Sequence, residues 1–127
     1  MATKKWAQDR DARFLALGRA YVGFAQTYPG LFVLMFRSER LDWSSPALYQ
    51  AAQAAFALLD ETEADLSFPN KAFDFAMLVK ATTRWSVMHG LATLLVDGRL
   101  APTAARVPGT NVDELIAAVL QSALGTI

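Results

Sequence analysis

Hydrophobic side chains recur at intervals of three and four positions along most of the chain, which is the spacing of one face of an α-helix. No segment alternates convincingly with the two-residue period of a half-buried strand. Pro29 and Gly30 predict the end of the first helix, and the short apolar piece over residues 31–36 must pack on another element. The pattern predicts an all-α fold with a single domain over residues 1–127. The stripe of the first helix comprises Phe14, Leu17, Tyr21, Phe24 and Tyr28.

A second helix is predicted to begin at Ser45 and Pro46, because serine can cap free helix amides and proline is favoured at the first helical position. A long helix is predicted to follow Asn70 and to run to about Val96. From Trp85 onward this helix is apolar nearly all round, which indicates burial on more than one side. The buried stripe of the second helix comprises Leu48, Ala52, Ala55 and Leu59, with Tyr49 and Phe56 beside it.

Beyond the long helix, the chain is predicted to form a loop and then a last helix. Two glycines and two prolines predict a loop over residues 98–109. The last helix begins at Asn111, and Glu114 three residues later completes a variant of the capping box. Alanines beside its apolar stripe leave room for another helix to come close.

The segment from Trp85 to Gly90 contains the only histidine of the chain. Trp85 and His89 are four residues apart, so their rings share one helix face. Gly90 lies in the helix interior, where glycine costs about 1 kcal/mol relative to alanine. Close approach of another backbone is the usual compensation, so we predict such an approach at Gly90.

The composition limits the classes of protein that fit. Hydrophobic residues make up 54% of the chain, which excludes disorder and indicates that some apolar surface faces a partner or a pocket. The formal net charge is zero, so no overall field draws the chain to nucleic acid or to an anionic membrane. The N-terminus turns charged before any apolar stretch develops, and no run reaches the roughly 18 apolar residues of a membrane span. We therefore expect a cytoplasmic protein without a membrane partner.

Patterns for catalysis are missing from the sequence. The chain has no cysteine, no G-x-S-x-G nucleophile motif and no glycine-rich phosphate-binding loop. His89 has no second histidine and no carboxylate three or four residues away to complete a metal site. The leading interpretation is a buried neutral imidazole hydrogen-bonded in the core or in an interface, while pocket lining and axial ligation of a haem stay open. We expect no enzymatic activity, no metal and no cofactor.

Several aromatic rings, Phe36 among them, favour a pocket for an apolar molecule, because such sites are lined by aromatic side chains and a few polar groups. An aromatic residue at helical spacing more often packs in the hydrophobic core, so a core role stays open for each of these residues. The candidate ligand-binding residues are Tyr21, Phe24, Tyr28, Phe32, Phe56, Trp85, Met88 and His89.

Two segments carry features of a known family. One combines Trp85, His89 and Gly90 with the exit Asp97-Gly98-Arg99-Leu100, and the other is the Tyr28-Pro29 break followed by Leu-Phe-x-Leu-Met-Phe. Together they resemble the C-terminal domain of TetR/AcrR-type transcriptional regulators, in its Trp-His-Gly form. The resemblance spans roughly residues 10–125.

This resemblance implies a TetR-like bundle of about five helices. In that family, the long penultimate helix and the last helix of each subunit form a four-helix bundle around a two-fold axis. The first helix, the short helix after Pro29 and the inner face of the long helix line the ligand cavity. The implied interface of a homodimer comprises Trp85, Gly90, Leu91, Leu94, Leu95, Leu115, Ile116, Val119 and Leu120.

We therefore expect the effector-binding and homodimerisation domain of a transcriptional regulator, which senses a small, largely apolar molecule. Regulators of this family bind DNA through an N-terminal helix-turn-helix domain, and we expect that domain to be absent from this chain. The alternative hypothesis is a stand-alone helical carrier or sensor of an apolar ligand, such as a lipid or haem, that does not act in transcription.

Overall fold

The computed structural model describes residues 2–36, 44–47, 49–50 and 74–124. Over these residues the chain forms helices and no strand, which confirms the all-α prediction. The helices are α1 (Ala2–Thr27), α2 (Pro29–Met35), α4 (Phe75–Val96), α5 (Leu100–Ala104) and α6 (Val112–Ala123).

Only the beginning of the helix predicted after Ser45 can be compared with the structure. The backbone at 46–47 and 49–50 is helical, and the amide of Tyr49 donates to the carbonyl of Ser45 over 3.1 Å. The rest of its predicted stripe lies outside the described residues, and so does the candidate ligand-binding residue Phe56.

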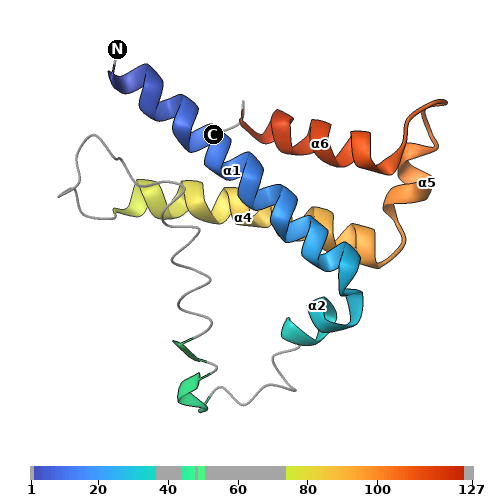
Figure 1. The fold of residues 1–127 in the computed structure, drawn as a ribbon, viewed down its shortest axis with the longest axis horizontal. Coiled ribbons are helices and arrows are strands. Elements are labelled where there is room, and N and C mark those ends of the chain that lie inside the picture. The colour runs from blue at the N-terminus through green and yellow to red at the C-terminus, as the bar shows by residue number, and fades with distance from the viewer. Residues whose placement is uncertain (1, 37–43, 48, 51–73, 125–127) are drawn as a thin grey trace.

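Helix α1 crosses both α4 and α6, and α6 returns antiparallel to α4 (Figure 1). The short α5 joins these two helices, while α2 follows the C-terminal end of α1. The core lies where α1 meets the other helices, so most of its residues come from three helices. Its buried side chains are Phe14, Val22, Ala25, Phe32, Met88, Leu91, Ala92, Leu100, Ile116, Leu120 and Ala123.

Local capping explains where the helices begin and end. Asp74 accepts a hydrogen bond from the amide of Met77 at 2.9 Å, so α4 begins at Phe75. The predicted exit after Val96 is confirmed: Gly98 has a φ of +73°, which suits glycine, and the amide of Arg99 donates to the carbonyl of Leu94 at 2.8 Å.

The predicted N-terminus of the last helix is also confirmed. Asn111 accepts from the amide of Glu114 at 2.8 Å, and Glu114 accepts from the amide of Asn111 at 3.4 Å. Both bonds of the capping box are therefore present, and two of the free amides at the start of α6 have partners.

The loop predicted over residues 98–109 was wrong in part, because α5 occupies Leu100–Ala104. Pro102 lies in the first turn of α5, where an amide has no partner within the helix, so proline is tolerated. Leu100 and Ala104, four residues apart, are both buried and hold α5 against the core.

Within the described residues of the single chain, no atom approaches Gly90 closely, whereas a side chain approaches Gly18. Close approach of a partner subunit at Gly90 stays a prediction. A Cβ atom added to Gly90 would meet nothing within 4 Å among the described residues. A Cβ added to Gly18 would lie 2.9 Å from Cδ2 of Leu120. Glycine at position 18 thus permits the crossing of α1 and α6, whereas nothing among the described residues covers α4 at Gly90.

Candidate functional site

Four aromatic side chains from three helices surround His89, and we call these five residues the His89 cluster. Tyr21 comes from α1, Phe32 from α2, Phe36 from the end of α2, and Trp85 from α4. The His89 ring centroid lies 4.4 Å from that of Phe36, 5.5 Å from Phe32, 5.9 Å from Trp85 and 6.1 Å from Tyr21. The chain therefore collects these rings at one place where three helices meet.

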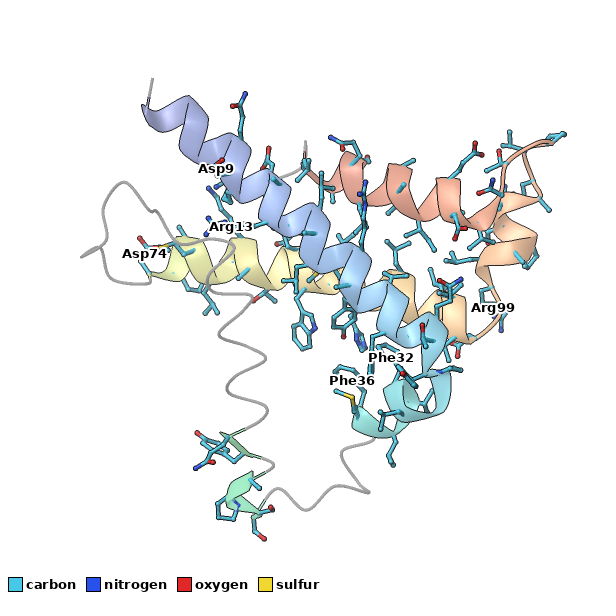
Figure 2. All side chains as sticks on the ribbon, viewed as in Figure 1. Asp9, Arg13, Phe32, Phe36, Asp74 and Arg99 are labelled. Carbon is cyan, nitrogen blue, oxygen red and sulfur yellow. The ribbon has the colours of Figure 1, made fainter. Side chains whose placement is uncertain are left out.

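The break between α1 and α2 positions the two phenylalanines. Helix α1 ends at Thr27, Tyr28 is the N-cap of α2, and Pro29 begins α2 with the backbone angle that a first helical turn needs. Phe32 and Phe36 are four residues apart and their ring centroids lie 5.2 Å from each other. Figure 2 shows both rings on the side of α2 that faces α1 and α4.

A short hydrogen bond links α1 to α4 inside the cluster. The hydroxyl oxygen of Tyr21 lies 2.7 Å from Nδ1 of His89. Burial raises the pKa of Tyr21, and a hydrogen bond from the Trp85 side chain opposes this increase in part. Burial lowers the pKa of His89, which favours the neutral imidazole. The hydrogen bond and the lowered pKa of His89 agree with the leading interpretation of the sequence, although the His89 side chain is half-buried and not fully buried.

Of the predicted ligand-binding residues, the structure brings Tyr21, Phe32, Trp85 and His89 together. The other described members of that set lie elsewhere. Phe24 pairs instead with the exposed Tyr28, at a ring-centroid distance of 5.6 Å.

Two residues differ from the predicted ligand-binding set: Met88 belongs to the set but lies in the core, and Phe36 is outside the set but lies in the His89 cluster. Met88 was a candidate ligand-binding residue and is fully buried in the core. Phe36 was not in the candidate set, although its ring is nearer to His89 than any other ring of the cluster. Its spacing of four residues from Phe32 was the available signal, since both residues lie on one face of the short helix.

The residues implied for a dimer interface divide into three groups. Leu91, Ile116 and Leu120 are buried within the single chain, because α1 packs on α4 and α6 there. Their side chains are covered, so a partner subunit would contact other residues. Leu94 is 45% exposed, and Gly90 borders open space. The remaining four are partly buried against the core: Trp85, Leu95, Leu115 and Val119.

A buried cation that the sequence analysis did not single out also joins α1 to α4. Arg84 is fully buried, and its guanidinium carbon lies 4.7 Å from the centroid of the Phe14 ring. Its Nη2 lies 3.4 Å from Oδ1 of Asp11. The available signal was position, since Arg84 falls in the stripe of buried α4 residues formed by Ala81, Met88 and others.

Two further properties concern metals and membranes. Among the described residues, no three histidine or carboxylate side chains gather where they could hold a metal ion. Within the same residues, no helix is long and apolar enough to cross a bilayer.

Comparison with known proteins places this fold in a family. Residues 14–122 match the family described as "Tetracyclin repressor-like, C-terminal domain". No curated protein and no solved structure matches the chain. The family match covers most of the sequence and agrees with the helical bundle described above. The chain thus belongs to the tetracycline repressor-like C-terminal domains, which are parts of TetR-family transcriptional regulators.

Proposed function

We propose that this domain binds a small, largely apolar effector at the His89 cluster and forms a homodimer, and that the effector controls DNA binding by an N-terminal helix-turn-helix domain. The observation that carries the proposal is the cluster itself, which collects aromatic rings from α1, α2 and α4 around one polar group. The family match supports the role in regulation.

The cluster is suited to an apolar molecule because all of its rings except the buried Phe32 are only partly covered. Phe36 is 43% exposed, and Tyr21, Trp85 and His89 are half-buried. Sites for apolar ligands combine aromatic walls with a small number of polar groups. The Tyr21–His89 pair supplies such polar groups, and a bound molecule would shield the exposed ring surface from water.

Binding at the cluster could also change how α1 and α4 pack on each other. It lies between α1 and α4, the two helices that pack most extensively on each other. A molecule bound among the rings would favour the arrangement of α1 and α4 that binds it more tightly. The difference between its affinities for the two arrangements would set how far their populations shift. The Asp11–Arg84 contact holds the same two helices at a second point.

The outer side of α4 supplies the surface for a dimer. Thr83, Ser86 and Leu94 are exposed and share this side with Gly90, where small side chains permit close packing. Ala117 and Ala118 are exposed on α6, the other helix that the family resemblance assigns to the interface. Two such helices per subunit would bury about 1,200–2,000 Å² in total, which is enough for a stable association.

Native mass spectrometry of the purified protein tests the dimer. We expect the mass of two chains for the unmodified protein and of one chain for Gly90→Leu, because the larger side chain would separate the facing helices. Gly23→Leu is the matched control, since a Cβ at Gly23 on α1 also meets nothing within 4 Å. It should remain dimeric.

Two results would count against this assembly. A monomer at every concentration would exclude the dimer and would favour the monomeric carrier of an apolar ligand. A Gly90→Leu protein that stays as dimeric as Gly23→Leu would remove α4 from the interface.

The same spectra test the effector site. We expect the dimer to carry additional small-molecule mass after mild purification, or to gain it when incubated with apolar compounds. Phe36→Ala should reduce this occupancy, because its ring contacts His89. Phe75→Ala is the matched control, since Phe75 is 78% exposed at the start of α4 and outside the cluster. Equal occupancy in both variants would place the ligand elsewhere.

A further inference from the structure

The contacts of Tyr21 determine which nitrogen of His89 carries the proton. The Trp85 side chain hydrogen-bonds to Tyr21, and an indole N–H can only donate. The Tyr21 oxygen lies 2.7 Å from Nδ1 of His89. If this oxygen accepted from both Trp85 and Nδ1, the Tyr21 hydroxyl proton would have no acceptor in these contacts, whereas a Tyr21 that accepts from Trp85 and donates to Nδ1 satisfies all three groups. Because Nδ1 accepts this bond, a neutral imidazole carries its own proton on Nε2.

The Nε2–H group is a donor that lies among aromatic rings. Within the ranges that the structure describes, the contacts of His89 are the Tyr21 hydrogen bond at Nδ1 and four ring contacts. The rings of Phe32 and Phe36 cannot accept a conventional hydrogen bond. If a bound molecule excludes water from this position, Nε2–H loses its hydrogen bond to water. The molecule must then supply an acceptor itself, because a buried donor without a partner weakens binding.

We propose that the effector is an uncharged molecule with an apolar body, that it carries a carbonyl-type acceptor, and that Nε2–H of His89 donates to this acceptor. This inference rests on the proposed function, since it assigns the polar contact of the same site. Ketones, esters and amides share the required chemistry: an apolar body and one strong neutral acceptor.

Charge at the site disfavours an anionic effector. Burial lowers the pKa of His89, so the imidazole is neutral when the site is empty. A carboxylate would lose its hydration beside aromatic rings, whose faces carry negative partial charge. Arg84 is the cation nearest to His89 in the sequence, and it contacts Asp11 and Phe14 on another side of α4.

Three small planar probes of nearly equal shape distinguish a neutral acceptor, no acceptor and an anionic acceptor. Acetophenone offers a ketone, α-methylstyrene replaces its oxygen with a methylene group, and benzoate replaces the methyl ketone with a carboxylate. We expect acetophenone to bind about tenfold or more tightly than α-methylstyrene, because the latter leaves Nε2–H without a partner. Benzoate should be the weakest of the three. In His89→Phe, acetophenone and α-methylstyrene should bind with similar affinity.

The single histidine gives a direct spectroscopic readout on the same samples. Protein labelled with ¹⁵N at histidine should show Nδ1 as an unprotonated, acceptor nitrogen and Nε2 as a protonated one before any probe is added. Acetophenone should shift the Nε2 signal, and α-methylstyrene should shift it less. In Tyr21→Phe, the loss of the hydroxyl should mix the two tautomers while His89 remains in place.

The outcomes separate this inference from the proposed function. A proton on Nδ1 in the free protein would overturn the inference, and so would equal affinity for acetophenone and α-methylstyrene or tightest binding of benzoate. In those cases, binding of any probe at the cluster would leave the proposed function standing. If no probe shifts a cluster residue up to its solubility limit, both the inference and the proposed effector site fail.

Discussion

His89 shows how tertiary contacts give one side chain a defined chemical state. On its own helix it has one neighbouring ring, Trp85, at the spacing that the sequence displays. The hydrogen bond at its Nδ1 is made with Tyr21, which lies 68 residues away along the chain. Burial then favours the neutral ring, because the charged form loses more hydration.

The lowered pKa of His89 predicts a loss of stability in acid. The unfolded chain binds a proton near the ordinary pKa of 6.5, whereas folded His89 binds it only at lower pH. Between these two values the unfolded state holds more protons, so stability falls as the pH decreases. Urea unfolding at about pH 7.5 and about pH 5 should show this decrease, and the decrease should be smaller in His89→Phe. An unchanged pH dependence in the variant would contradict the assignment.

The contact between Gly18 and Leu120 predicts a second residue-level effect. Gly18→Val should lower the free energy of unfolding by about 1–3 kcal/mol, because its Cβ would lie 2.9 Å from a side chain that is itself fully buried. Gly23→Val makes the same change on the same helix where nothing lies within 4 Å. Chemical denaturation of both should show the larger loss at position 18; similar losses would mean that helix propensity alone explains them.

At the scale of elements, the helix ends follow from short-range hydrogen bonds. Asp74, Gly98 and Asn111 each act on atoms no more than four residues away. Such contacts form whenever the local backbone is helical, so their residues are readable in the sequence. The short α5 is different: the glycines and prolines around it predict a loop, and only the burial of Leu100 and Ala104 makes it a helix.

The capping box of α6 predicts a measurable loss on mutation. Asn111→Ala should lower the free energy of unfolding by about 1 kcal/mol, because the amide of Glu114 loses its acceptor at 2.8 Å. Asn111→Asp should retain the stability, since a carboxylate accepts the same bond and is favoured at a helix N-terminus. Urea denaturation of the two variants provides the comparison, and equal losses in both would show that the cap contributes little.

At the scale of the whole molecule, α1 packs against three other helices, and one side of α4 is exposed among the described residues. α1 contacts α2, α4 and α6 and buries Phe14, Val22 and Ala25 against them. On α4, the residues that face α1 are buried, while Val79 and Leu94 on the other side are exposed. Apolar surface of this kind favours association in water.

The proposed dimer predicts that thermal stability depends on protein concentration. If folding and association are coupled, the unfolding midpoint of the unmodified protein should rise as its concentration increases, because mass action favours the dimer. Gly90→Leu should show a midpoint that is nearly independent of concentration. Differential scanning calorimetry over about a hundredfold range of concentration would test this. A constant midpoint in the unmodified protein would argue for a monomer.

The sequence by itself determined the fold class, the family and several helix ends, although it placed the start of the long helix after Asn70 and α4 begins at Phe75. Apolar residues at helical spacing define one face regardless of what covers it, and caps act within a single turn. For this reason the end of α4 at Val96 and the beginning of α6 after Asn111 agree with the structure. Trp85 and His89 could be placed on one face for the same reason.

Only the tertiary structure decided which faces meet. It placed a close contact between two helices at Gly18 and none at Gly90 among the described residues, and it brought Phe36 to His89 while burying Met88 in the core. These outcomes depend on how distant helices pack, and many residues of similar size and polarity compete for each contact. A periodic pattern identifies the apolar face of a helix, but the angle and height at which another helix crosses it are properties of the assembled core.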